Sequence, residues 1–324
     1  MLILCNFTKN PARVRILEEQ IRAALDTQVS RIELVADPQR WEEVLPRAEV
    51  IGSFGLTPEE FSRCEKLRWL HLGLAGVDKA LHPALVRSAV VVTNARGIHR
   101  DVMAQYVLAA VLSCANRFDL AAVGQAKREW RQKDIVRERH SIAGKVVGII
   151  GTGAIGTAAG QLCSACGMRA VGVRRSPEKG APEGFEKIWG LEDLPELLAL
   201  ADYLVLSAPL TSETRSLLGA AQLAMMKPGA FLINIARGAM VDEAALVTAL
   251  RDKKIAGAFL DVFTSEPLPP EHPLWSLENV FITPHTSGNF EQYVERVGEQ
   301  FAENLAHYVR GEALFNVVEK ARGY

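Results

Sequence analysis

An arginine, a glutamate and a histidine stand in three short segments of the last third of the chain. These segments are Asn234-Ile-Ala-Arg237-Gly238, Asp261-Val-Phe-Thr-Ser-Glu266 and Thr283-Pro-His285-Thr-Ser-Gly288. Each lies where an apolar run ends, and the carboxyl ends of parallel strands are where open α/β sheets bind ligands. Arg237 can hold and polarise a 2-oxo acid, His285 can exchange a hydroxyl proton, and Glu266 can keep that histidine protonated. The three side chains therefore predict a site that interconverts a carbonyl and a hydroxyl with proton transfer.

A second candidate site is a glycine-rich turn in the middle of the chain. It contains Gly151, Gly153, Ala154, Ile155 and Gly156, follows a β-branched run and opens a helical pattern. The first glycine permits a tight turn, the second lets a pyrophosphate approach the backbone, and the third lets the helix pack closely on the strand. The helix N-terminus adds N–H donors and the positive end of its dipole. With a strand before it and a helix after it, the motif predicts a dinucleotide site, and a turn without a ligand is the alternative.

The strand after this helix indicates which dinucleotide is bound. An NAD site carries an acidic residue about 20 residues further on, whereas this chain has Val173-Arg174-Arg175-Ser176. Two guanidinium groups and a hydroxyl suit a 2′-phosphate through charge-assisted, bidentate hydrogen bonds. We therefore expect a preference for NADP(H), with NAD(H) as the less favoured cofactor. The alternative is a pair of solvated arginines at a strand end.

The elements that must position these residues alternate between apolar runs and helical patterns. In the first third, strands are predicted at residues 2–7, 31–36, 50–54, 67–72 and 90–93, and helices at 11–25, 39–47, 58–64 and 80–88. A long helix is predicted at residues 99–116. From residue 145 onward, strands are predicted at 146–150, 169–173, 203–207, 230–235, 256–262 and 280–283, and helices at 154–166, 191–200, 220–226, 243–252 and 290–309. Strands that alternate with helices imply parallel sheets with right-handed crossovers, and therefore two α/β units.

The composition excludes several classes of protein. With 48% hydrophobic and 23% charged residues, the chain can bury a core and does not resemble a disordered protein. Its 37 basic and 38 acidic residues give a net charge of -1, so we expect no nucleic acid and no anionic membrane as partner. Residues 146–168 carry no charge, but their glycines and β-branched residues predict a strand, a turn and a helix rather than a membrane span. The charged stretch at residues 127–140 is interpreted as a solvated surface or a subunit-contact arm, with an anion site as the alternative.

The cysteines indicate neither a disulfide framework nor a metal site. There are 5 in the whole chain, an odd and small number that favours a reducing, cytoplasmic location. Cys163 and Cys166 form a C-x-x-C pair on a predicted helix, but zinc would need two further ligands at suitable spacing. We therefore expect this pair to belong to the core, and no metal ligand is assigned.

Together these motifs resemble the D-isomer-specific 2-hydroxyacid dehydrogenases, and within that family the glyoxylate/hydroxypyruvate reductase-like branch. The resemblance covers essentially the whole chain and also includes Gly73-Leu-Ala-Gly76-Val-Asp78, Ala208-Pro-Leu-Thr211 and Pro273-Leu-Trp275. It implies an α/β fold in which a Rossmann nucleotide-binding domain, residues 99–288, is inserted into a flavodoxin-like α/β substrate domain, residues 1–98 and 289–324. It also implies a homodimer joined through the nucleotide-binding domains.

The resemblance further implies NAD(P)-dependent reduction of a 2-oxo acid to the D-2-hydroxy acid, with glyoxylate and hydroxypyruvate as candidate substrates. Arg237 should hold the substrate, His285 should be the general acid in reduction and the base in oxidation, and Glu266 should pair with His285 and tune it. The implied cofactor-binding positions are Gly151, Gly153, Ala154, Ile155, Gly156, Arg174, Arg175, Ser176, Ala208, Pro209, Thr214, Ala236, Arg237, Asp261, His285 and Gly288. The implied substrate-binding positions are Leu74, Ala75, Gly76, Arg237 and His285, the first three through their backbone N–H groups.

Two other functions stay open. One is a non-catalytic, nucleotide-sensing scaffold similar to transcriptional corepressors, which the presence of Arg237, Glu266 and His285 disfavours. The other is a formate- or phosphite-type dehydrogenase. Formate enzymes typically have glutamine where Glu266 stands, whereas the phosphite-type activity is harder to exclude from the motifs.

Overall fold

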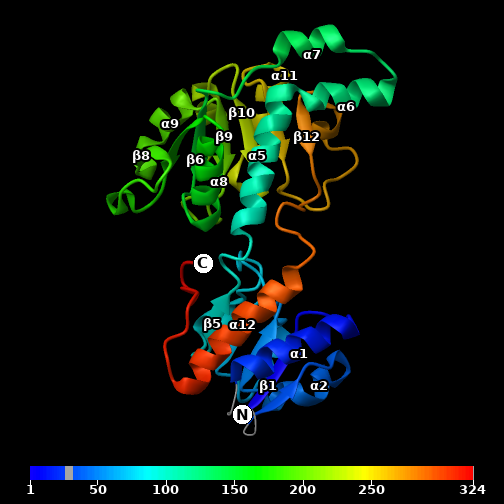
Figure 1. Ribbon diagram of the computed structural model, residues 1–324, viewed down its shortest axis with the longest axis vertical. Helices are drawn as coiled ribbons and strands as arrows, with labels where there is room; N and C mark the ends of the chain where they lie inside the picture. Colours follow the sequence, from blue (N-terminus) through cyan, green and yellow to red (C-terminus); the bar gives the residue numbers. More distant parts are fainter. Residues whose placement is uncertain (26–31, 324) are drawn as a thin grey trace. The chain divides into compact units, whose positions relative to one another are not determined.

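The chain folds into two compact units, and one of them is built from both ends of the sequence. In the computed structural model, which describes residues 1–25 and 32–323, the first unit comprises Met1–Ile98 with Phe290–Tyr324 and the second comprises His99–Asn289 (Figure 1). The second unit is thus inserted between two segments of the first. Asn289 belongs to the second unit, one residue beyond the expected boundary.

The first unit contains a five-stranded parallel sheet. Its strands are β1 (Leu2–Asn6), β2 (Glu33–Val35), β3 (Val50–Ser53), β4 (Trp69–Leu72) and β5 (Val91–Asn94), in the order β2-β1-β3-β4-β5. This is the flavodoxin-like strand order, so the predicted fold class of this unit is confirmed. The predicted strand at 31–36 is shorter than expected, and Arg31 lies outside the described residues.

Helices cover both faces of this sheet. They are α1 (Pro11–Leu25), α2 (Trp41–Val44), α3 (Pro58–Ser62), α4 (Pro83–Arg87) and α12 (Tyr293–Arg310). Apolar side chains of α1 and α12, among them Leu17, Ile21 and Phe301, share one buried cluster with the sheet. The α12 helix comes from the other end of the sequence, so residues far apart along the chain complete one core.

Local sequence signals explain where two of these helices begin and end. Thr57 and Glu60 form a capping box at the start of α3, because the Thr57 hydroxyl accepts from the Glu60 N–H and the Glu60 carboxylate accepts from the Thr57 N–H. The predicted helix at 39–47 is broken into the short α2 and two flanking 3-10 turns. Pro46 accounts for the end of α2, since proline has no backbone N–H to continue the helix.

The C-terminal tail pairs with the edge strand β5. Val317 bridges Thr93 in antiparallel fashion, and the Val318 N–H donates to the Val92 carbonyl at 2.8 Å. The Lys320 ammonium then donates to three carbonyl oxygens near the end of α4, at 2.6–3.3 Å. The tail therefore covers backbone groups that an edge strand would otherwise expose.

The second unit contains a seven-stranded parallel sheet. Its strands are β6 (Val146–Ile150), β7 (Arg169–Val173), β8 (Phe185–Trp189), β9 (Tyr203–Leu206), β10 (Phe231–Asn234), β11 (Gly257–Leu260) and β12 (Val280–Ile282), in the order β12-β11-β10-β9-β6-β7-β8. From β6 the strands continue to one side of the sheet as β7 and β8, and from β9 they continue to the other side as β10, β11 and β12. The carboxyl ends of β6 and β9 therefore form the topological switch point of a Rossmann fold. The predicted Rossmann class is confirmed.

Two helical layers enclose this sheet (Figure 1). On one face lie α5 (Arg100–Asn116) and α8 (Ala154–Ala165), and on the other α9 (Leu194–Leu200), α10 (Ala220–Met225) and α11 (Glu243–Arg251). Within β6, Val147 and Ile149 belong to the buried cluster on the side of α5 and α8. Val146 and Ile150 belong to the buried cluster on the side of α9, α10 and α11. This alternation of side chains is why the strand is apolar throughout.

Three elements of the second unit were not predicted. The edge strand β8 has two exposed charged residues, Glu186 and Lys187, between its apolar ends, which masked it as a strand. The helices α6 (Phe118–Lys127) and α7 (Gln132–Glu138) lie in and beside the charged stretch that was interpreted only as a surface or an arm. The charges of α7 leave no clear apolar period, whereas α6 carries only two charges and follows α5 after a single left-handed residue, Arg117.

The uncharged stretch at 146–168 forms β6, a glycine turn and α8, as predicted. Within residues 1–25 and 32–323, no single helix is long and apolar enough to cross a membrane. Only α5 and α6 together reach that length and composition, and the chain bends by 67° between them.

Candidate active site

The structure brings His285 and Glu266 together at the carboxyl end of the second sheet. His285 follows β12, Glu266 follows β11, and the His285 Nδ1 lies 2.9 Å from the Glu266 Oε2. The other carboxylate oxygen accepts from the Phe263 N–H at 3.0 Å, which fixes the plane of the carboxylate. Because Nδ1 faces the carboxylate, Nε2 is the imidazole nitrogen directed away from it. The side chain of His285 is 46% exposed, so this pair can exchange a proton with a small molecule.

The backbone of His285 has an unusual conformation that Asp261 stabilises. His285 has φ +54°, in the left-handed region that non-glycine residues rarely adopt. Its N–H donates to the Asp261 carbonyl at 2.9 Å, while the Asp261 carboxylate accepts from the N–H groups of Thr286 and Ser287 at 2.8 and 3.0 Å. Asp261 is fully buried. It therefore holds the turn that carries the histidine.

Burial alone would raise the pKa of Asp261, but hydrogen bonds from Ser287 and Thr283 outweigh it and hold that pKa below its ordinary value. The Thr283 hydroxyl is 2.7 Å from the carboxylate, and the Tyr106 hydroxyl on α5 is 3.2 Å away. That Asp261 lines the nicotinamide side stays a prediction. The structure places it beneath the His285 turn as an ionised, buried anchor.

Arg237 lies on the loop after β10, beside the loop that carries Glu266. Its Nη1 donates to the Ala236 carbonyl at 2.8 Å. The next residue, Gly238, touches the backbone of Phe263, and a Cβ added at Gly238 would lie 1.9 Å from the Phe263 carbonyl carbon. Only glycine permits this approach. Arg237, Glu266 and His285 thus follow three neighbouring strands, β10, β11 and β12.

The glycine turn after β6 has the geometry that an approaching pyrophosphate needs. Gly151 has φ +96°, and a Cβ there would lie 2.5 Å from the Ala208 nitrogen. A Cβ at Gly156 would lie 2.1 Å from the Gly151 carbonyl oxygen, so the helix packs directly on the turn. A Cβ at Gly153 would meet no atom within 4 Å. Gly153 therefore presents open backbone at the start of α8, whose first turn includes Ala154 and Ile155.

At the end of β7, Arg174 is half-buried and Arg175 is exposed. One Nη of Arg174 donates to the Gly180 carbonyl. Its Nε is buried and has no hydrogen-bond partner among the described residues. Ser176 starts the 3-10 turn that follows. A buried guanidinium N–H without an acceptor fits a site that an anionic group completes, so these residues are compatible with a 2′-phosphate.

The other residues predicted on the cofactor side lie along the same edge. The Pro209 carbonyl accepts from the Thr214 hydroxyl at 2.7 Å, which closes the loop after β9. Ala236 is buried. Gly288 lies against His99, and a Cβ added at Gly288 would be 3.1 Å from the His99 ring.

The predicted substrate-binding turn, Leu74 to Gly76, lies in the first unit at the end of β4. The Leu74 carbonyl accepts from the Ala95 N–H at 3.0 Å, and the Ala75 carbonyl accepts from the Asn94 side chain at 2.8 Å. These bonds tie the turn to the end of β5. Both bonds are accepted by carbonyl oxygens of the turn, so they fix the orientation of its peptide groups.

The cysteine pair has no site geometry. Cys163 is fully buried, Cys166 is exposed, and both are free thiols. Within the part of the chain that the structure describes, no group of three or more His, Cys, Asp or Glu side chains could hold a metal ion.

Comparison with known proteins identifies the family. The model of the D-isomer specific 2-hydroxyacid dehydrogenase NAD binding domain matches residues 108–287. The chain belongs to the D-isomer specific 2-hydroxyacid dehydrogenases. It is an NAD(P)-dependent 2-hydroxyacid dehydrogenase or 2-oxoacid reductase of class EC 1.1.1.-. The predicted family and the prediction of an enzyme are therefore confirmed.

Individual members of this dehydrogenase family cover most of the chain. A glyoxylate reductase of Korarchaeum cryptofilum is 35% identical over 269 residues, which are 81% of this chain and 79% of that protein. An NADPH-dependent glyoxylate/hydroxypyruvate reductase of Sinorhizobium meliloti, solved with NADP and sulfate, has a TM-score of 0.84 at 27% identity and covers 100% of this chain and 99% of its own. A family member from Xanthobacter autotrophicus Py2, solved with NADPH and MES, has a TM-score of 0.83 at 30% identity and covers 99% of each chain.

Proposed function

We propose that this dehydrogenase uses NADPH to reduce a small 2-oxo acid to the D-2-hydroxy acid, with His285 as the general acid. The observation that carries the proposal is the 2.9 Å contact between His285 Nδ1 and Glu266, which leaves Nε2 directed away from the carboxylate. The bound cofactor supplies the hydride that adds to the carbonyl carbon. The carbonyl oxygen takes its proton from His285 Nε2, and the reverse transfer accompanies oxidation of the hydroxy acid.

The neighbouring residues prepare His285 for this step. Glu266 orients the imidazole, because its Oε2 lies 2.9 Å from Nδ1 and leaves Nε2 directed away from the carboxylate. The Arg237 guanidinium binds the substrate carboxylate and polarises the carbonyl, as bidentate contacts of arginine allow. Asp261 contributes indirectly, because it holds the turn on which His285 stands.

The substrate test is a panel of 2-oxo acids assayed with NADPH and with NADH. Glyoxylate and hydroxypyruvate are the first candidates, since the similar proteins from K. cryptofilum and S. meliloti carry those names. We expect at least one small 2-oxo acid to be reduced efficiently. A protein that binds NADPH and reduces none of the panel would refute the proposal.

The NADPH preference is supported by the buried Nε of Arg174, which has no hydrogen-bond partner in residues 1–25 and 32–323. We expect kcat/KM to be higher with NADPH than with NADH, and Arg174→Ala to raise the KM for NADPH about 10- to 100-fold. The KM for NADH should hardly change. Arg169→Ala is the matched control, because Arg169 begins the same strand and pairs with Glu186 on the surface. Equal efficiency of wild type with both cofactors would contradict the preference.

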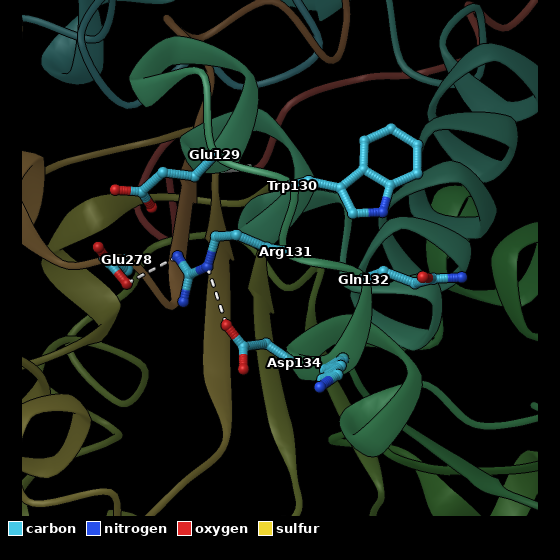
Figure 2. A pocket seen from close by; sticks show the side chains of 7 residues that line it. Glu129, Trp130, Arg131, Gln132, Asp134 and Glu278 are labelled. Atoms are coloured by element: carbon cyan, nitrogen blue, oxygen red, sulfur yellow. Dashed lines mark hydrogen bonds and ion pairs between the residues drawn. The ribbon is translucent and has the colours of Figure 1, made fainter.

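A homodimer joined through the second unit is also part of the proposal. Trp130 lies between α6 and α7 and is 90% exposed, and Phe118 and Val136 on those helices are exposed as well. Figure 2 shows the indole ring of Trp130 directed away from Arg131. The Arg131 guanidinium binds Glu278 at 3.1 Å and Asp134 at 3.2 Å. The segment that presents Trp130 is thus fixed by ion pairs, and such an exposed aromatic anchor is typical of protein interfaces.

Light scattering measures this assembly directly. We expect a dimer for the wild type and for Leu200→Glu, a control on the exposed surface of α9. Trp130→Glu should shift the molar mass toward the monomer. A monomeric wild type at micromolar concentration would overturn this part of the proposal.

A cytoplasmic location completes the proposal. It is supported by the five free thiols, because a reducing compartment keeps cysteines in the thiol state.

A further inference from the structure

Glu243 contacts the loop that carries Glu266 although it belongs to a different element. It lies in the first turn of α11, and its side chain is 19% exposed. One carboxylate oxygen accepts from the Thr264 N–H at 2.6 Å, and the other lies 3.6 Å from the His272 Nε2. The helix cap itself is made by Asp242, whose carboxylate accepts from the Ala245 N–H at 3.1 Å. The Glu243 carboxylate is therefore used outside its own helix.

The two partners of Glu243 lie on either side of Glu266. Thr264 is two residues before Glu266, and His272 is six residues after it. The His272 Nδ1 accepts from the Leu274 N–H at 3.3 Å, so the imidazole proton is on Nε2 and faces Glu243. One carboxylate thus accepts a hydrogen bond from the loop before Glu266 and lies close to the same loop after it.

The loop that Glu243 contacts also packs on the segment that carries Arg237. Gly238 packs on the backbone of Phe263 and Thr264, and α11 begins only five residues after Gly238. A shift of Thr264 would move Phe263, whose N–H fixes the carboxylate of Glu266. Displacement would then reach His285 through Glu266.

We propose that Glu243 is a positioning residue for the proton transfer: by accepting from the Thr264 N–H and lying against His272 it keeps Glu266 directed at His285. The inference rests on the proposed function, because it assigns Glu243 an effect on the protonation of His285. Glu243 itself contacts neither the imidazole nor, in this proposal, the substrate.

Three variants of Glu243 separate its contacts. Glu243→Ala removes the carboxylate, and Glu243→Asp keeps the charge at the helix N-terminus but withdraws it from Thr264. Both should lower kcat/KM for reduction by about 10- to 100-fold, as small misplacements of catalytic groups do. Both should also change the pH dependence of the reduction rate. Glu243→Gln retains an acceptor for the Thr264 N–H and should preserve the pH profile.

Asp242→Ala is the matched control, since it removes the cap of the same helix without touching the loop. It should lower the melting temperature and leave the pH profile unchanged. In the Glu266→Gln background, Glu243→Asp should add no further pH shift, because its effect runs through Glu266. An NMR titration of the His285 imidazole in the NADPH complex reports the same shift without turnover.

The outcomes distinguish this inference from the proposed function. If His285→Ala stays active, the proposed function fails. If His285→Ala is inactive but Glu243→Asp keeps the wild-type pH profile and imidazole titration, only the role of Glu243 is overturned. Should Glu243→Ala fail to fold, Glu243→Asp and Glu243→Gln carry the comparison.

Discussion

The first unit should lose stability in mild acid because it buries a neutral histidine. His71 on β4 is fully buried, and its ring lies 5.5–6.3 Å from the rings of Phe7, Trp69 and Phe301. Its Nδ1 is 2.8 Å from the Thr93 hydroxyl, and its Nε2 is buried without a hydrogen-bond partner among the described residues. A protonated imidazole would be a buried cation without a carboxylate.

The size of the effect follows from the pKa of His71. Burial lowers it to about 3, whereas an unfolded chain has a histidine pKa of about 6.5. As pH falls below about 6.5, His71 becomes protonated in the unfolded state, whereas in the folded state it stays neutral until about pH 3. The stabilisation is therefore present above that range and is lost on acidification. Between pH 7 and pH 5 the free energy of unfolding should fall by about 2 kcal/mol from this residue.

The assay is denaturant unfolding at several pH values between 5 and 7, with hydrogen exchange of β4 as a local readout. His71→Phe keeps an aromatic ring of similar size and cannot be protonated, so its stability should depend less on pH by that same amount. His307→Gln, a change at a partly exposed histidine on α12, should keep the wild-type dependence. If His71→Phe and wild type lose the same free energy between pH 7 and pH 5, the reasoning is refuted.

Three further predictions concern the proton transfer and the C-terminal tail. His285→Ala should lower the turnover number by at least about 100-fold while NADPH binding, followed by fluorescence, is retained; near-normal turnover would exclude His285 as the general acid. Glu266→Gln should change the pH dependence of the reduction rate, because the imidazole loses the carboxylate at its Nδ1, and an unchanged pH–rate profile would remove Glu266 from this role. Lys320→Met should lower the free energy of unfolding by about 1–3 kcal/mol, since three carbonyl oxygens lose their donor. Calorimetry measures this loss, with Lys66→Met at an exposed site as the control. Equal melting temperatures of the two variants would contradict the prediction for Lys320.

The parts of the site that could be predicted are those whose residues are adjacent in the sequence. The glycine turn from Gly151 to Gly156 and the segment around His285 each combine a strand end with the residues that are proposed to function there. Their structural context could be read from neighbouring residues. The fold class followed for the same reason, because apolar runs and helical patterns alternate along most of the chain.

The contacts that support the site were not predictable because they join distant residues. Tyr106 lies 155 positions from Asp261 in the sequence, and in the sequence it is one apolar position of a helical pattern. Glu243 resembles any acidic residue in a first helical turn until Thr264 is seen to lie 2.6 Å from it. The burial of Asp261 was not predictable for the same reason, since it depends on the turn at 283–287.

The α12 helix has a consequence for synthesis of the protein on the ribosome. The buried face of α1, with Leu17 and Ile21, is completed by Val297 and Phe301 of α12. The first 98 residues therefore leave the ribosome with part of their core missing, whereas residues 99–289 have all of their own strands and helices as soon as they emerge. The middle of the chain can thus fold before its beginning does, and the N-terminal segment has to remain unaggregated until residues 290–323 have been made.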